Sequence, residues 1–243
     1  PFFVRRRIMK KNEKRGCAEI LKICFVTKER LSEFWERTGG EDADLIFFPL
    51  FDDVTVSYER ELKGETAYFE DVALLSKACK CVVVCGYHTS TRGVVRSSAV
   101  VAENGRILGV SDALSSIDGA RNCGAFFKVY ETSAGRIGVT VAEDAYFPEA
   151  LRTLTLCGSD FVLCPFSMQA GSAENVVLRA AAFIYGAPIA LCSHGYAFVA
   201  GADGETAFAS PMPVSFYNIE KNGEYHLIEW RQRGFFKRNH GKY

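Results

Sequence analysis

The sequence predicts an α/β fold in which a mixed β-sheet core is covered by helices. Apolar runs of strand length alternate with segments of helical periodicity, and two segments have the pattern of a β-hairpin. Strands such as 20–26 are apolar on both faces, which is typical of a sheet covered on both sides. The 243 residues suit one large domain that buries a substantial core.

In the first third of the chain, the alternation predicts two helices that connect three buried strands. The helix at 28–40 is amphipathic and ends at a Gly-Gly pair, and the helix at 65–80 has Thr66 in a position to act as its N-cap. The strands are expected at 20–26, 43–50 and 81–87.

The middle of the chain predicts two hairpins followed by a second helix–strand alternation. The hairpin at 96–111 turns at Asn104-Gly105, a favoured two-residue turn, and the hairpin at 127–144 turns at 133–135. Further on, helices are expected at 146–158, with Pro148 near its first turn, and at 172–186. The corresponding strands are expected at 160–167 and 187–193, and the last part of the chain contains strand-like pieces and turns.

Composition excludes several classes of protein. No apolar run approaches the roughly 20 residues of a membrane-spanning helix, and the apolar-then-basic start is the reverse of a secretory signal. The nine cysteines are odd in number and lie mostly in apolar runs, which favours free thiols in a reducing cytoplasm. No cysteine has a histidine at zinc-site spacing, so we expect no metal.

The net charge of zero hides an uneven distribution. Residues 1–16 form a basic N-terminal extension of net charge +6, residues 231–243 form a basic C-terminal tail of +5, and the single domain at 17–230 carries −11. The basic ends are either solvated or attracted to an acidic surface of the same or a neighbouring subunit. Nucleic-acid binding is not favoured, because the basic residues lie at two termini and on no demonstrable common face.

Residues 127–167 carry the most informative motifs, and they resemble the nitrilase superfamily of carbon–nitrogen hydrolases. That family has a GRIGV strand, a Cys-x-Asp elbow, an FPE helix start and a strand that ends in Pro. The matching positions here are 135–139, Asp144, 147–149 and Pro165. Further blocks at 42–49, 97–109 and 178–189 agree in order and spacing, so that the resemblance spans roughly residues 20–210.

The resemblance implies a four-layer α-β-β-α sandwich and a catalytic set that this chain lacks. In the family a Cys attacks the substrate, a Glu acts as general base and a Lys stabilises the charged intermediate. The matching positions are Ala142, Leu50 and Ala113, and residues 107–127 contain no Lys. We therefore expect no catalytic residues, and a fold retained for ligand binding or for assembly. The alternative is an active amidase or nitrilase with a rearranged site.

Several polar residues remain as candidates for a ligand pocket. Asp144 is expected to be structural at the elbow, and Glu143 either contacts a ligand or is solvated. His194 is more simply a structural histidine at a strand end. The candidate pocket comprises Glu143, Tyr146, Ser167, Met168 and His194.

The resemblance also implies partners and the absence of a cofactor. We expect a small amide or carboxylate ligand, no cofactor, and a homodimer that pairs through helices of its outer layers. The helix at 146–158 carries the apolar residues Phe147, Leu151, Leu154 and Leu156, which suggests spare apolar surface.

Overall fold

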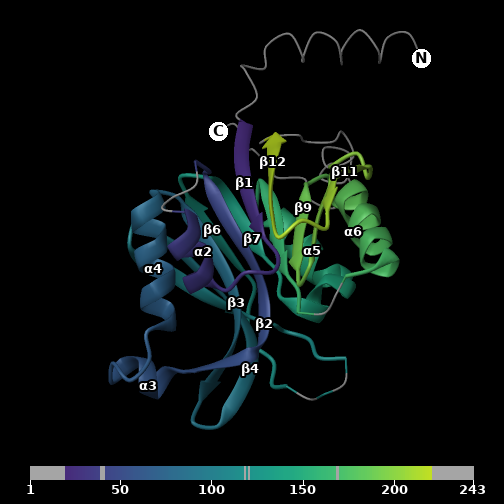
Figure 1. Ribbon diagram of the computed structural model, residues 1–243. Coiled ribbons are helices and arrows are strands. Elements are labelled where there is room, and N and C mark those ends of the chain that lie inside the picture. The colour runs from purple at the N-terminus through teal and green to yellow at the C-terminus, as the bar shows by residue number, and fades with distance from the viewer. Residues whose placement is uncertain (1–19, 39–41, 118, 120, 168–169, 221–243) are drawn as a thin grey trace, which may run out of the picture.

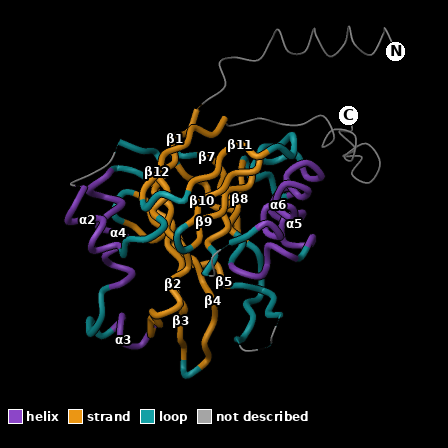
Figure 2. The backbone as a smooth tube through the Cα atoms, turned by 45° about the vertical axis from the view of Figure 1, so that its right-hand side comes forward, coloured by secondary structure: helices purple, strands orange, loops and turns teal. Residues whose placement is uncertain are grey.

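The structure is a computed structural model that describes residues 20–38, 42–117, 119, 121–167 and 170–220. Two six-stranded β-sheets pack face to face, and helices cover both outer faces (Figures 1 and 2). This arrangement confirms the expected four-layer α-β-β-α sandwich. The basic segments at 1–16 and 231–243 lie outside the described residues.

The first sheet has the order β12-β1-β2-β3-β4-β5. Its strands are β1 (Ile20–Val26), β2 (Leu45–Ser57), β3 (Val82–Thr91), β4 (Val94–Glu103), β5 (Arg106–Asp112) and β12 (Val214–Glu220). β1, β2 and β3 are parallel to one another, and the remaining pairs are antiparallel. The pairing of β12 with β1 brings the last described strand beside the first.

The second sheet repeats this pattern in the order β6-β7-β8-β9-β10-β11. Its strands are β6 (Lys128–Thr132), β7 (Gly135–Val139), β8 (Phe161–Pro165), β9 (Ile189–Ser193), β10 (Tyr196–Ala200) and β11 (Thr206–Ser210). Here β7, β8 and β9 are parallel, with antiparallel neighbours on either side. Each sheet therefore has three parallel strands whose carboxyl ends point the same way.

The helices form the two outer layers (Figure 2). The bounds are α2 (Leu31–Thr38), α3 (Tyr58–Leu62), α4 (Tyr68–Cys79), the 3₁₀ helix η1 (Ala142–Tyr146), α5 (Pro148–Leu156) and α6 (Ser172–Tyr185). Apolar residues of α2 and α4 pack on the first sheet in one buried cluster, and those of α5 and α6 pack on the second sheet in another.

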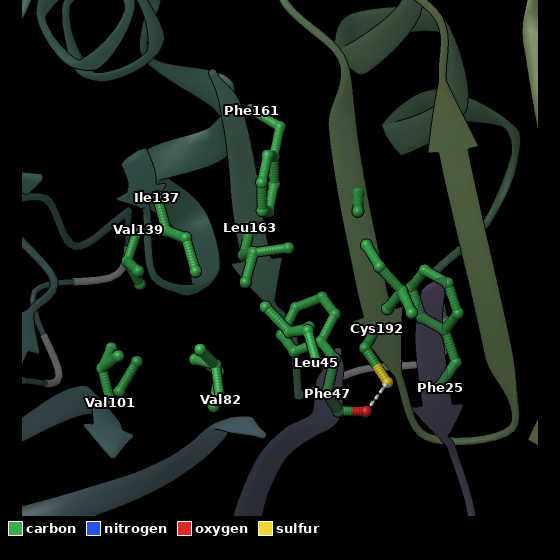
Figure 3. Close-up of a cluster of buried hydrophobic side chains, with 14 of the residues drawn as sticks. Phe25, Leu45, Phe47, Val82, Val101, Ile137, Val139, Phe161, Leu163 and Cys192 are labelled. Carbon is green, nitrogen blue, oxygen red and sulfur yellow. Dashed lines mark hydrogen bonds between the residues drawn. The ribbon is translucent and has the colours of Figure 1, made fainter. Parts of the chain in front are cut away.

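A third and larger cluster fills the space between the sheets (Figure 3). Phe25 and Phe47 of the first sheet face Ile137, Phe161 and Leu163 of the second, and all five are fully buried. At its edge the Cys192 thiol donates a hydrogen bond of 3.4 Å to the Phe47 carbonyl, which joins the two sheets directly. Burial of apolar surface on both sides of both sheets is the dominant stabilising contribution.

Most of the predicted elements are confirmed, and two strands are longer than expected. The 43–50 strand continues to Ser57 and the 81–87 strand to Thr91. The turn at Asn104-Gly105 is confirmed, and both residues have the positive φ, 51° and 82°, that this turn requires.

The prediction that Thr66 caps a helix at 65–80 is wrong. The helix α4 begins at Tyr68, and the hydroxyl of Thr66 has no hydrogen-bond partner. Instead, the Glu61 carboxylate accepts hydrogen bonds from the amides of Tyr68 and Phe69, at 3.1 and 3.0 Å. The short helix α3 thus supplies the cap from outside the local sequence, which a pattern of adjacent residues does not reveal.

The expectation of spare apolar surface on the 146–158 helix needs correction. Leu151 and Leu154 are buried against the second sheet, and of the large apolar residues of α5 only Leu156 is exposed, at 43%. The neighbouring helix α6 exposes more apolar surface, through Val176 and Ile184.

Candidate functional site

The candidate site lies where the parallel strands of the two sheets end together. The Leu50 amide, in β2, donates a hydrogen bond of 3.2 Å to the carbonyl of Phe166, which follows β8. The Gly195 amide, in the β9–β10 turn, donates one of 2.9 Å to the carbonyl of Thr27, which follows β1. We call this region, defined by Thr27, Leu50, Ala142, Phe166 and Gly195, the carboxyl edge. Ligands of α/β proteins commonly bind at such carboxyl ends.

Ala142 is the first residue of η1, at the sharp turn that follows β7, as expected for the elbow. Its φ is +50°, in the left-handed region that costs a residue with a Cβ about 1 kcal/mol or more. The Ala142 carbonyl lies 4.0 Å from the Cys164 thiol of the adjacent strand. The backbone therefore keeps a conformation that presents residue 142 at the edge, although its side chain is only a methyl group.

Leu50, Ala113 and Ala142 belong to the same buried cluster between the sheets, with exposures of 3, 4 and 3%. Leu50 lies at an irregularity of the β2–β3 pairing, where a Cβ on Gly86 would come within 2.6 Å of the Leu50 Cα. Only glycine permits this close approach. The three positions bring together no titratable or nucleophilic group.

Asp144 ties the elbow to the segment that carries Ala113. Its carboxylate is 1% exposed and accepts hydrogen bonds from the amides of Leu114, at 2.8 and 3.0 Å, and Ser115, at 2.7 Å. Burial raises the pKa of Asp144, although these hydrogen bonds oppose the rise. It accepts no helix-capping hydrogen bond, since α5 has no side-chain cap. Asp144 therefore links the elbow to the segment that contains Leu114 and Ser115.

Tyr146 and Glu174 form a second polar pair on the side of the second sheet. The Tyr146 hydroxyl donates a short hydrogen bond to the Glu174 carboxylate, which also accepts one of 2.6 Å from the Gly171 amide. Burial opposes ionisation of Glu174, but these hydrogen bonds outweigh it and lower its pKa. The Tyr146 ring packs edge-on against Phe166, at 6.0 Å between centroids. This predicted pocket residue therefore lies at the carboxyl edge.

An array that the sequence analysis did not single out crosses the first sheet at the same edge. His88 is 3% exposed, and its Nε2 lies 3.0 Å from the Asp52 carboxylate while its Nδ1 lies 3.4 Å from the Ser97 hydroxyl. The Ser97 carbonyl accepts a hydrogen bond of 2.8 Å from the Ala113 amide. Burial lowers the pKa of His88; the hydrogen bond to Asp52 opposes this effect and the Arg121 charge adds to it, so the neutral imidazole is favoured.

Three other residues of the predicted pocket, Ser167, Met168 and His194, differ in where they lie. Ser167 is half-buried and follows Phe166 at the carboxyl edge, whereas Met168 lies outside the described residues. His194 is exposed in the two-residue turn between β9 and β10, beside Gly195.

The described residues contain neither a metal site nor a membrane-spanning helix. In that part of the chain no group of three or more His, Cys, Asp or Glu side chains could hold a metal ion. Nor is any helix within it long and apolar enough to cross a membrane.

Known proteins resemble this chain in both sequence and fold. Residues 27–212 match the family described as carbon–nitrogen hydrolase. A probable nitrilase of Schizosaccharomyces pombe is 26% identical over 215 residues, which cover 76% of this chain and 78% of that protein.

Two solved structures illustrate the similarity of fold. A carbon–nitrogen hydrolase from Helicobacter pylori G27 has a TM-score of 0.68 at 18% identity, covering 90% of this chain and 94% of its own. A branch 10 member of the nitrilase superfamily from Saccharomyces cerevisiae has a TM-score of 0.69 at 14% identity, covering 93% and 97%. At these identities the two structures indicate a shared fold alone.

Proposed function

We propose that this chain, which belongs to the carbon–nitrogen hydrolase family, is a catalytically inactive member that binds a small amide-like ligand at the carboxyl edge. The observation that carries the proposal is the set of residues at the three positions matched to the family's catalytic groups. Leu50, Ala113 and Ala142 are apolar and lie together in one buried cluster. Fold alone would not support this conclusion, because function depends on the residues of the site.

Each of the three residues lacks a property that amide hydrolysis requires. Leu50 cannot accept a proton, Ala113 cannot stabilise developing negative charge, and Ala142 has no nucleophile. The nearby Cys164 thiol does not supply a substitute. It is fully buried, and burial raises its pKa, so that it stays protonated and a poor nucleophile.

An active hydrolase with a rearranged site is the second candidate, and the Asp52–His88–Ser97 array is the observation in its favour. A hydroxyl, an imidazole and a carboxylate in series resemble an activated serine. Two features weigh against it. Ser97 is only 3% exposed, so its hydroxyl is not accessible to a substrate. The nearby amides of Leu114 and Ser115 already donate hydrogen bonds to Asp144, so they are not available to stabilise an oxyanion.

An assay of ammonia release tests the proposal. The purified chain is incubated with a panel of primary amides and nitriles, and we expect no release above the buffer control. Turnover would contradict the proposal. If that turnover disappeared in the Ser97→Ala variant, the array would be its source and the second candidate would replace the first.

We also propose that the chain assembles as a homodimer in the cytoplasm. The exposed apolar residues Leu156 of α5 and Val176 and Ile184 of α6 support an interface on this outer layer, because the two helices contact each other and apolar surface exposed on one layer favours association. None of the eight cysteines among the described residues forms a disulfide, which supports a reducing compartment. Light scattering or sedimentation measures the assembly directly.

A further inference from the structure

The outer surface of the second sheet has a hollow of about 350 Å³ between α6 and the turn that joins β10 to β11. We call it the α6 hollow, and its lining residues are Val176, Arg179, Ala180, Phe183, Asp203 and Gly204. The four residues from α6 share one face of the helix, since they are three or four positions apart. Val176 and Phe183 are 63 and 40% exposed. The α6 hollow therefore offers apolar surface for a contact.

The turn is held firmly against the helix. Gly204 has a φ of +82°, and a Cβ there would come within 2.9 Å of the Phe183 Cβ, so only glycine fits without a shift of the helix or the turn. The Arg179 Nε donates a hydrogen bond of 2.7 Å to the Gly204 carbonyl, and the Arg179 guanidinium lies 3.5 Å from the Glu205 carboxylate. The two walls of the α6 hollow are thus fixed relative to each other, which lowers the cost of binding.

The charge at the α6 hollow is negative. Asp203 and Glu205 are exposed acids of the turn, and among the described residues that line the hollow Arg179 is the only basic one. Apolar surface beside acidic groups is complementary to a segment that carries both aromatic and basic side chains. Residues 231–243 have this composition, with five Lys or Arg, no acid and the pair Phe235-Phe236.

The last described strand leads toward the α6 hollow. Glu220, which ends β12, pairs with the first residue of β1, and the turn at 201–205 adjoins the first residue of β9. Since the parallel strands of both sheets end together at the carboxyl edge, their first residues lie together at the opposite end of the sandwich (Figure 1). Phe208 of β11 stacks on Tyr217 of β12 at 5.1 Å between centroids, so these two strands face each other across the sheets.

We propose that the α6 hollow binds the basic segment 231–243 of the same chain. Phe235 and Phe236 supply the aromatic contact with α6, and the neighbouring basic side chains lie beside the acids Asp203 and Glu205. Of the alternatives that the sequence leaves open for this segment, the structure thus supplies an acidic surface on the same subunit. The inference is independent of the proposed function, because it does not involve the carboxyl edge.

The length of the connection favours the same chain over a second copy. At about 3.3 Å per residue, residues 221–235 can span up to about 50 Å, more than the roughly 30 Å width of a small domain. A covalent connection of this kind gives an effective concentration in the millimolar range. Leu156 and Ile184 do not line the α6 hollow, so the bound segment leaves them available for the proposed dimer interface.

Photo-crosslinking of the full chain tests the proposal. The photoreactive residue p-benzoylphenylalanine replaces Phe235 in one variant and Phe236 in another, and the crosslinked products are separated by mass and mapped by mass spectrometry. Each variant is also made with Ala180→Arg, which places bulk and positive charge in the α6 hollow. The control is Ala173→Arg, the same change at an exposed position of α6 that does not line the hollow. Arginine is a good helix former, so both variants keep the helix.

We expect crosslinks from one or both positions to residues 176–183 or 201–205, in a product of monomer mass. Ala180→Arg should lower their yield about fivefold, the change that a loss of about 1 kcal/mol produces in an equilibrium constant, and Ala173→Arg should leave it unchanged. Crosslinks to the α6 hollow only in a product of dimer mass would show that a second copy fills it and would overturn the inference. It would also be overturned if neither position crosslinked to the hollow, or if the two arginine variants gave equal yields.

Discussion

Replacing Asp144 by Ala tests whether this carboxylate holds the segment that carries Ala113 against the elbow. The substitution leaves the partly buried amides of Leu114 and Ser115 without their acceptor. An unsatisfied buried donor costs about 1–3 kcal/mol, so two such donors would cost about 2–6 kcal/mol; because these two amides are only partly buried, we expect the free energy of unfolding to fall by an amount in the lower part of that range. Asp144→Asn keeps one carbonyl acceptor and should lose about half as much.

Urea unfolding of the variants measures these losses, and Asp203→Ala provides the control. The Asp203 carboxylate also accepts a backbone hydrogen bond, at 3.0 Å from the Glu205 amide, but in an exposed turn. We expect this control to lose less than about 1 kcal/mol, since water replaces the exposed acceptor. If Asp144→Ala were no less stable than Asp203→Ala, the hydrogen bonds of Asp144 would not stabilise the contact between the elbow and the segment that carries Ala113.

The pH dependence of the same experiment has a definite sign. Burial raises the pKa of Asp144 above its ordinary value of 3.8, so the folded state binds the proton more tightly than the unfolded state. The resulting stabilisation is complete below the ordinary pKa and is lost as the pH rises through the pKa of the folded state. The wild-type chain should therefore lose stability relative to Asp144→Asn over this window. A relative gain in stability with rising pH would refute the assignment.

Three further predictions follow from the elbow and the outer layer. Ala142→Cys alone should release no ammonia from amides or nitriles, because Leu50 and Ala113 still supply neither base nor positive charge; turnover would show that these roles lie elsewhere. Ala142→Gly should cost about 1 kcal/mol less stability than Ala145→Gly in urea unfolding, because only Ala142 has a left-handed backbone; equal losses would contradict that conformation. Ile184→Glu should weaken the proposed dimer in sedimentation experiments, whereas Leu62→Glu, which changes an exposed apolar residue of α3, should not; a monomeric wild-type chain would refute the interface.

The elements that could be predicted from the sequence are those fixed by neighbouring residues. Asn104-Gly105 determines its turn locally, and the apolar period determines β1 at 20–26. The hydrophobic pattern alone did not predict which strands belong to which sheet, because strands of either sheet are apolar on both faces. The pairing of β1 with β12 joins residues almost 200 positions apart, and no local signal encodes such a contact. The division into four layers came from the family resemblance.

The candidate site was predicted only in part, for a physical reason. The elbow residues 142–146 are contiguous, so their motif was visible in the sequence. His88 was missed because the expected strand ended at 87, whereas β3 continues to Thr91 and the alternation from Val84 points His88 toward the second sheet. Its partner Asp52 comes from the irregular part of β2, and strand irregularities depend on the neighbouring strand.

The apolar residues at positions 50, 113 and 142 change what the carboxyl edge can do. A catalytic set would place a thiol, a carboxylate and an ammonium at this end of the inter-sheet core, where each needs solvation or a charged partner. Leu50, Ala113 and Ala142 instead extend the apolar core up to the edge, and burial of their side chains stabilises the fold. Polar groups remain beside this apolar edge, since Glu143 follows Ala142 directly and the Tyr146–Glu174 pair adjoins Phe166. Under the proposed function, such a surface holds a ligand by contact and leaves it intact.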